Sequence, residues 1–205
     1  LIVILIGGIV EMVPTFLVKS NVPTISSVKP YTPLELHGRD IYIREGCNNC
    51  HSQMIRPFRS ETERYGEYAK AGEFVYDHPF LWGSKRTGPD LLRVGGKYPD
   101  SWHYHHMLDP ESMSPNSIMP PYPWLFTDDL DVSLTEAKIG AMRTLGVPYQ
   151  QGYEEIAVQD VEAQQTKIAE GLKIEGIEVG KEKEIIALIA YLQRLGTDIQ
   201  VKDSE

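Results

Sequence analysis

Cysteine is scarce in this sequence. The 205 residues contain two cysteines, Cys47 and Cys50, and both lie in the stretch GCNNCHSQMIRPF, residues 46–58. Two cysteines cannot form the dense disulfide framework of a small secreted domain. Their local motif must therefore explain why they are there.

Positive charge is also in deficit. The chain has 20 Lys and Arg against 29 Asp and Glu, which gives a formal net charge of -9. Because nucleic-acid binding depends on clustered Lys and Arg, we expect no nucleic-acid partner. An acidic surface suits a basic protein partner or none.

Strand patterns are weak throughout, and neither an internal repeat nor a low-complexity tract occurs. Helical spacing of apolar residues, by contrast, recurs along the chain. We expect helices at 34–45, 61–72, 100–108, 134–145, 154–173 and 182–195. Ser60 with Glu63 and Ser133 with Glu136 form capping-box patterns. Five prolines in 110–124 argue against a regular element there, although they stiffen the loop.

A long hydrophobic run occupies residues 1–18, LIVILIGGIVEMVPTFLV. As a helix it would extend about 27 Å, nearly the thickness of the bilayer hydrocarbon. A secretory signal is the alternative, but VPTFLVKSNV offers no small-residue cleavage site. We expect a transmembrane anchor over 1–18 in contact with membrane lipid, a Pro- and Ser-rich linker over 19–33, and a globular domain over 34–198.

Cys47, Cys50 and His51 form a Cys-x-x-Cys-His motif. In this motif the two thiols add to the haem vinyl groups as thioethers, and the adjacent imidazole becomes the proximal iron ligand. A redox dithiol would leave His51 unexplained, and a zinc site would need a second pair of ligands. The histidines at 103–106 are more typical of surface or packing residues. The motif therefore predicts one covalent haem c.

An electron carrier keeps both axial positions of the iron filled, and the usual second ligand is a methionine thioether. The candidates are Met54, Met107, Met113 and Met119. Met54 is too close to His51 in sequence to reach the opposite haem face, and Met107 lies in an expected helix. Met119 is followed directly by two prolines, which would fix the approach of its sulfur. We expect Met119 to be the ligand and the others to fill gaps in the core.

Other groups are needed around a haem. The stretch TGPDL at 87–91 offers a rigid carbonyl acceptor for the second ring nitrogen of His51, which would fix its tautomer. Haem propionates need hydrogen-bond donors, and the available side chains are Arg56, Arg59, Arg86, Arg93 and Trp102.

Three long stretches carry a more specific resemblance: GRDIYIREGCNNCHSQMIRPFRSETERYGEYAKAGE (38–73), YDHPFLWGSKRTGPDLLRVGGKYPDSWH (76–103) and MPPYPWL (119–125). Together with the C-terminal LIAYLQRLG they resemble a cytochrome c. More narrowly, the chain resembles the mono-haem cytochrome c subunit (O subunit) of cbb3-type oxidases, which are C-family haem-copper cytochrome c oxidases. The resemblance implies a mainly α fold: a class I cytochrome c-like domain with long loops, preceded by one N-terminal transmembrane helix.

The resemblance also implies a function. Electrons would enter from a di-haem cytochrome c subunit or a soluble cytochrome c and pass through this haem. They would then reach the haem b of a haem-copper catalytic subunit, where dioxygen is reduced in aerobic respiration. The chain would be non-catalytic on its own, anchored once in the bacterial inner membrane with its haem domain in the periplasm. Residues 54–86 would form a docking insertion, and 128–180 a variable acidic helical insertion.

Several site residues follow from the same resemblance. The Pro89 carbonyl would orient His51, and Ser84 is similar to a position near a calcium ion at the subunit boundary. The expected haem surroundings are Arg56, Pro89, Leu91, Trp102 and Tyr122.

Two other functions fit the motif. The chain could be a haem-based gas sensor or ligand-binding protein, in which Met119 does not hold the iron. It could also be the cytochrome subunit of a membrane dehydrogenase, which passes electrons outward. A reduced-state spectrum separates the first alternative, and the co-purifying subunit separates the second.

Overall fold

The computed structural model describes residues 1–18, 23–83 and 85–200, and this part of the chain is mainly helical and contains no β-strand. One isolated antiparallel bridge joins Asp129 and Lys183. The absence of strands agrees with the expected cytochrome c-like α fold. The α-helices and 3-10 helices (η) are α1 (Ile2–Leu17), α2 (Pro33–Arg44), η2 (Cys47–Asn49), α3 (Arg59–Tyr65), η3 (Ala71–Phe74), α4 (Asp100–Leu108), α5 (Pro110–Met113), η4 (Pro123–Phe126), α6 (Thr135–Thr144), α7 (Tyr153–Ile174) and α8 (Glu184–Arg194).

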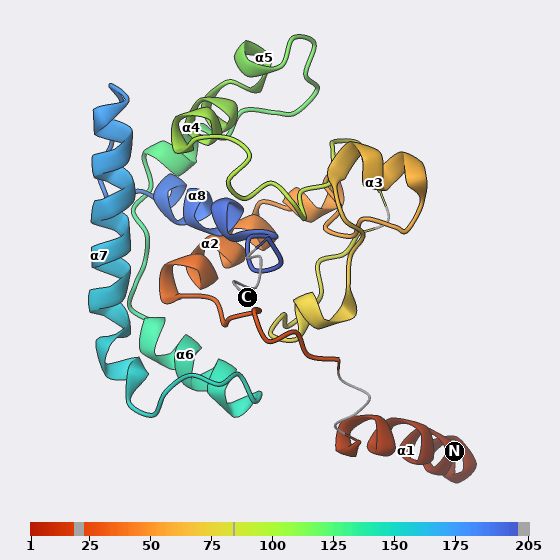
Figure 1. Cartoon of the computed structure of the whole chain (residues 1–205). Helices are drawn as coiled ribbons and strands as arrows, with labels where there is room; N and C mark the ends of the chain where they lie inside the picture. The colour runs from red at the N-terminus through yellow and green to blue at the C-terminus, as the bar shows by residue number, and fades with distance from the viewer. Residues whose placement is uncertain (19–22, 84, 201–205) are drawn as a thin grey trace, which may run out of the picture.

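Helices α2 and α8 cross at the centre of the molecule (Figure 1). A capping box starts α2, because the Thr32 side chain accepts from Glu35 N at 3.3 Å while Glu35 accepts from Thr32 N at 2.8 Å. Gly38 lies at the crossing, where a Cβ atom would be 1.9 Å from the Ala187 carbonyl oxygen. Only a glycine lets the two helices approach this closely.

Helix α7 extends along one edge of the molecule, with α6 beside its N-terminal end (Figure 1). Its residues Val161 and Leu172 are fully buried in the main core. Ile139 of α6 packs with Leu36 and Ala157 in a second, smaller cluster. The acidic helical segment is therefore part of the folded domain.

The expected helices near 100–108, 154–173 and 182–195 are confirmed as α4, α7 and α8. The capping prediction for Ser60 is wrong, since α3 starts after Phe58 without a side-chain cap and stops at Gly66, where φ is 107°. The capping prediction for Ser133 is also wrong: the residue before α6 is Leu134, which makes no side-chain cap. Ser60 lies inside α3 and Ser133 lies one residue before the N-cap of α6, so neither serine occupies the N-cap position that a capping box requires.

The proline-rich stretch 110–124 is more regular than expected. It contains α5, which starts at Pro110 and is capped by the Asp109 side chain accepting from Ser112 N at 3.3 Å. It also includes the start of η4 at Pro123. Proline is tolerated at the first position of a helix, so here it starts short elements instead of preventing them.

The N-terminal run is helical, but α1 has 16 residues and ends at Leu17. At 1.5 Å per residue it extends about 24 Å, less than the roughly 30 Å of bilayer hydrocarbon. Across residues 1–18, 23–83 and 85–200, no helix combines the length and apolarity needed to cross a membrane. The expected transmembrane anchor over 1–18 is therefore not supported.

Candidate functional site

The Cys-x-x-Cys-His motif follows directly from the end of α2. Gly46 adopts a left-handed conformation with φ of 70°, which turns the chain into η2. The carbonyl of Cys47 then accepts from Cys50 N at 3.2 Å and from His51 N at 2.9 Å. This turn leaves Cys47 half-buried and Cys50 exposed, both as free thiols.

Cys47 does not have the properties of a reactive redox cysteine. Burial, with smaller contributions from Glu45 and Cys50, raises the pKa of Cys47 to about 12. A reactive dithiol needs a cysteine whose pKa is lowered to about 7 or below. Cys47 is instead protonated, as expected of a residue that packs against the core.

His51 is oriented by a backbone carbonyl. Its Nδ1 lies 2.8 Å from the Pro89 carbonyl oxygen, as the TGPDL stretch predicts. Because a carbonyl only accepts, Nδ1 carries the proton, and in the neutral ring Nε2 keeps a free lone pair. Burial lowers the pKa of His51 and so favours the neutral ring. Gly88 makes room for it, since a Cβ atom there would lie 2.3 Å from His51 Cε1.

Two backbone hydrogen bonds flank the contact between His51 and the Pro89 carbonyl. Gly88 N donates to the Cys50 carbonyl at 3.0 Å, and Leu91 N donates to the Ser52 carbonyl at 2.9 Å. The loop 88–92 therefore lies directly along residues 50–54. This pairing fixes the Pro89 carbonyl opposite the His51 ring.

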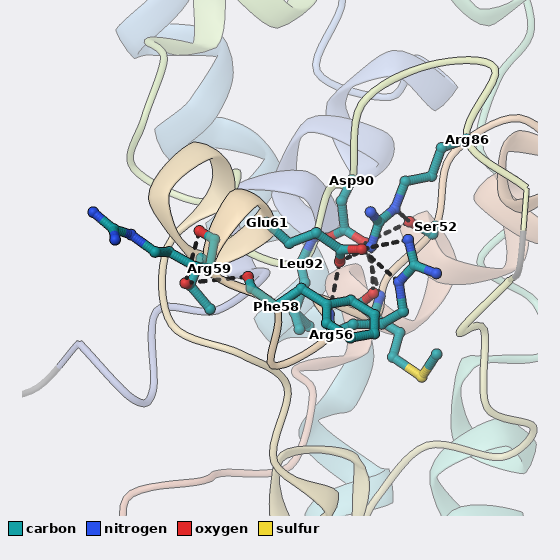
Figure 2. A network of polar contacts seen from close by, with 10 residues as sticks. Ser52, Arg56, Phe58, Arg59, Glu61, Arg86, Asp90 and Leu92 are labelled. Carbon is teal, nitrogen blue, oxygen red and sulfur yellow. Dashed lines mark hydrogen bonds and ion pairs between the residues drawn. The ribbon is translucent and has the colours of Figure 1, made fainter.

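Charged side chains hold the same two segments together (Figure 2). Arg86 donates to Ser52 Oγ at 2.7 Å, to the Met54 carbonyl at 2.7 Å and to Glu61 at 2.6 Å. Glu61 also accepts from the backbone and side chain of Arg56. Hydrogen bonds from Arg86 and then Arg56 lower the pKa of Glu61 to about 2. The network joins α3 to the segment that follows His51.

Met119 is half-buried against the main core, against which Cys47 also packs. Met107 belongs to the interior of that core, at 8% exposure, and fills space in α4. Met142 packs instead against the smaller cluster of Leu36 and Ile139. Among these three methionines, Met119 is therefore the one that contacts the main core and is also partly exposed.

Three of the expected haem surroundings occupy suitable places. Leu91 and Tyr122 are half-buried against the same core as Cys47 and Met119. Burial raises the pKa of Tyr122, and the neighbouring Cys47 and Cys50 add to this shift, which places its hydroxyl near both thiols. Trp102 stacks between Tyr98 at 4.1 Å and His106 at 4.5 Å, measured between ring centroids.

The arginines are not gathered around the motif as free donors. Arg56 pairs with Glu61, Arg59 with Glu63, Arg86 with Glu61 and Arg93 with Glu73. Arg56, expected near the haem, is thus part of the α3 network. Ser84, the candidate calcium position, lies outside the described residues. Within the described ranges, no three His, Cys, Asp or Glu side chains come together as a metal site.

His103 and His106 are candidate haem contacts that the sequence pattern indicated as surface or packing residues. His103 is buried and its Nε2 has no hydrogen-bond partner, and the same holds for the buried Nδ1 of His106. The pKa of His106 is lowered by burial and then by His51, which places the two rings near each other. A buried ring nitrogen without a partner is costly and calls for a ligand atom. The four-residue spacing from Trp102 to His106 puts both rings on one face of α4, and this spacing is the sequence feature that could have indicated their role.

These residues fit a covalently bound haem. The motif supplies two free thiols and a neutral imidazole with an open Nε2, and Met119 supplies a thioether on the same core. The unpartnered nitrogens of His103 and His106 provide polar atoms for the carboxylate edge of such a group. The donor set is the one that low-spin haem uses.

A profile of the family described as cytochrome c oxidase, mono-haem subunit (FixO), matches residues 1–199. The chain belongs to this family. No curated protein matches it. The family assignment confirms the resemblance to the mono-haem subunit of cbb3-type oxidases.

Membership of the FixO family gives the chain a role in electron transport. It is a haem-containing subunit of a cytochrome c oxidase, and its partners are the other subunits of that oxidoreductase complex. The complex is a membrane-associated bacterial assembly. One haem per chain agrees with the one Cys-x-x-Cys-His motif in the sequence.

Proposed function

We propose that this chain carries single electrons from a cytochrome c donor to the haem b of the oxidase's catalytic subunit, through one covalent haem c. The donor is the di-haem subunit or a soluble cytochrome c. Dioxygen is reduced in the haem-copper catalytic subunit, so this chain is non-catalytic on its own. The observation that carries the proposal is the His51–Pro89 hydrogen bond of 2.8 Å within a Cys-x-x-Cys-His motif of a FixO member.

The haem supplies reversible one-electron reduction, and the chain's residues hold it in place. Cys47 and Cys50 would attach the haem through thioethers, and His51 and Met119 would hold its iron. Iron held by both residues would not take an external ligand, which would suit electron transfer better than gas binding. Thioether ligation also raises the reduction potential.

The surrounding side chains exclude water and satisfy the haem's polar edge. Leu91, Tyr122 and the stacked ring of Trp102 form the apolar wall. We assign the propionate contacts to the free ring nitrogens of His103 and His106, in place of the paired arginines. Arg56, Arg59, Arg86 and Arg93 already pair with carboxylates, so a propionate would have to displace an existing ion pair to contact any of them.

Residues 54–86 are proposed as the docking insertion that contacts the catalytic subunit. This segment presents Phe58 and Phe80, which are 57% and 54% exposed. Phe80 stacks on Trp82 with 4.7 Å between ring centroids and an interplanar angle of 2°. Exposed aromatic side chains are typical of a contact with another protein. We assign the domain to the periplasm, on the outer face of the bacterial inner membrane, because haem is attached to this motif in that compartment.

The spectrum of the reduced and oxidised protein tests the haem assignment. We expect a six-coordinate low-spin haem that does not bind CO, with a sulfur-to-iron charge-transfer band in the oxidised state. Met119→Leu should abolish this band and lower the potential, whereas the matched variant Met113→Leu should leave both unchanged. A five-coordinate ferrous haem that binds CO rapidly in the unaltered protein would favour the gas sensor.

Purification in mild detergent tests the partner. The full chain should bring down a haem-copper subunit and a di-haem cytochrome c subunit. Recovery with a dehydrogenase instead would refute the assignment of the electron acceptor. Loss of the haem-copper subunit on replacing Phe80 and Trp82 together by Ser would locate the contact in 54–86.

A further inference from the structure

Asp90 is a buried carboxylate beside the axial histidine's acceptor. Its side chain is 0% exposed. It accepts hydrogen bonds from Ser52 Oγ at 2.5 Å, from Met54 N at 2.9 Å and from Leu92 N at 2.9 Å. A charged group without water must be fully hydrogen-bonded, and Asp90 meets this requirement.

The donors to Asp90 come from two different segments. Ser52 and Met54 follow His51 by one and three residues, whereas Leu92 belongs to the loop that contains Pro89. Asp90 itself follows Pro89 directly. The Asp90 carboxylate therefore connects two segments. One contains Pro89, whose carbonyl accepts the hydrogen bond from His51, and the other contains the residues just after His51.

Arg86 closes this arrangement (Figure 2). It lies 3.7 Å from Asp90 and donates to Ser52 Oγ and the Met54 carbonyl, both at 2.7 Å. Arg86 therefore balances the buried charge and binds the same two residues as Asp90 does. Its remaining bond, to Glu61 at 2.6 Å, connects the arrangement to α3.

We infer that Asp90, supported by Arg86, is a positioning residue that sets the hydrogen bond between His51 Nδ1 and the Pro89 carbonyl. Through this bond it controls how strongly His51 donates electrons to the haem iron. The inference rests on the proposed haem-binding function. A firmly held acceptor makes the imidazole more basic and so favours the oxidised iron. Loosening the loop weakens the bond and favours the reduced iron.

The test uses the full haem-loaded chain and three variants. Asp90→Asn removes the charge and two acceptor positions, Asp90→Glu keeps the charge but displaces the carboxylate, and Ser52→Ala removes one donor without changing charge. The readouts are the redox titration and the proton signal of His51 Nδ1–H in the 15N-histidine-labelled ferrous protein. Glu63→Gln, which removes a charge from the exposed face of α3, is the control.

We expect Asp90→Asn to raise the ratio of reduced to oxidised haem at a fixed ambient potential by about threefold. Asp90→Glu and Ser52→Ala should raise it by about twofold, and all three should move the Nδ1–H signal and speed its exchange with solvent. Glu63→Gln should change neither. If Asp90→Asn does not fold, Asp90→Glu and Ser52→Ala carry the test.

The inference is overturned if the Nδ1–H signal and its exchange rate stay at their unaltered values in every variant. A shift of potential confined to Asp90→Asn, with no change in that signal, would show that Asp90 acts only through its charge. Either result leaves the haem in place and the proposed function intact. If instead the unaltered chain binds no haem, the proposed function itself fails, and this inference fails with it.

Discussion

Two regions of this molecule, a helical half and a loop half, differ in the interactions that stabilise each of them. The helical half consists of α2, α6, α7 and α8, and most of its buried side chains are apolar, although polar residues such as His37, Gln165 and Glu184 are also buried there. The loop half, residues 45–126, carries the proposed haem-site residues and contains charged side chains with little exposure, such as those of Asp90 and Glu73 at 0% and 6%. Loops lack the repeating backbone bonds of a helix, so their buried polar groups need side-chain partners. The loop half therefore depends on the ion pairs and hydrogen bonds of its buried charged groups in addition to its short helices.

The strongest test of this difference is the buried pair Arg93–Glu73. Its two contacts measure 2.6 and 2.9 Å, and the side chains are 8% and 6% exposed. Glu73→Gln leaves the guanidinium buried beside a neutral partner, so we expect a loss of about 4 kcal/mol in the free energy of unfolding. Urea unfolding of the haem-loaded protein measures it. A loss below about 1 kcal/mol would mean that backbone contacts hold the loop half.

Gly38 tests the helical half. In Gly38→Ala the new Cβ atom would lie 1.9 Å from the Ala187 carbonyl oxygen and 2.7 Å from Tyr191 Cβ. Helices α2 and α8 must then separate, and we expect a loss of about 3 kcal/mol in the free energy of unfolding. Gly171→Ala is the matched control, because nothing lies within 4 Å of its Cβ position in α7. That change should stabilise the protein by about 0.5 to 1 kcal/mol.

Equal destabilisation by Gly38→Ala and Gly171→Ala would contradict this prediction. It would mean that Gly38 is not needed for the close approach of α2 and α8. Differential scanning calorimetry would show whether Gly38→Ala unfolds in one transition or in two. We expect one transition at a lower temperature than in the unaltered protein. Two transitions would show that the halves unfold separately.

The same contrast explains what could be predicted from the sequence. Helices such as α4 and α8 follow from periodicity, the haem assignment follows from the chemistry of the Cys-x-x-Cys-His motif, and the Pro89 acceptor follows from the resemblance to cytochromes c. The roles of Asp90 and Arg86 could not be predicted, because their partners at Ser52 and Glu61 lie 25 to 38 residues away in sequence. No local pattern encodes such long-range pairing.

His37 makes a titratable contact inside the helical half. Its Nδ1 accepts from Lys138 Nζ at 2.9 Å, and its Nε2 donates to Thr135 Oγ1 at 2.8 Å, which joins α2 to α6. Burial, and then the Lys138 ammonium, lower the pKa of His37 from 6.5 to about 4. Asp40 and Asp131 partly oppose this shift.

Because the folded state disfavours the charged ring, the unfolded state takes up the proton first as the pH falls. Stability contributed by neutral His37 is complete above pH 6.5 and is lost as the pH falls from 6.5 to about 4. We expect about 2 kcal/mol of such loss, measured as the difference in pH dependence between the unaltered protein and His37→Gln. Parallel curves for the two proteins over this range would refute the role of His37.

The smallest effect belongs to an exposed pair in the loop half. Arg59 and Glu63 are one turn apart on α3, with 2.7 Å between their charged atoms and side chains 90% and 62% exposed. Water and salt screen this pair, so Glu63→Gln should cost only about 0.3 kcal/mol, less at high salt. Urea unfolding at low and high ionic strength measures the cost. A loss close to that of Glu73→Gln would mean that charge count, and not burial, stabilises the loop half. The difference between two Glu→Gln changes in one half therefore isolates burial as the cause.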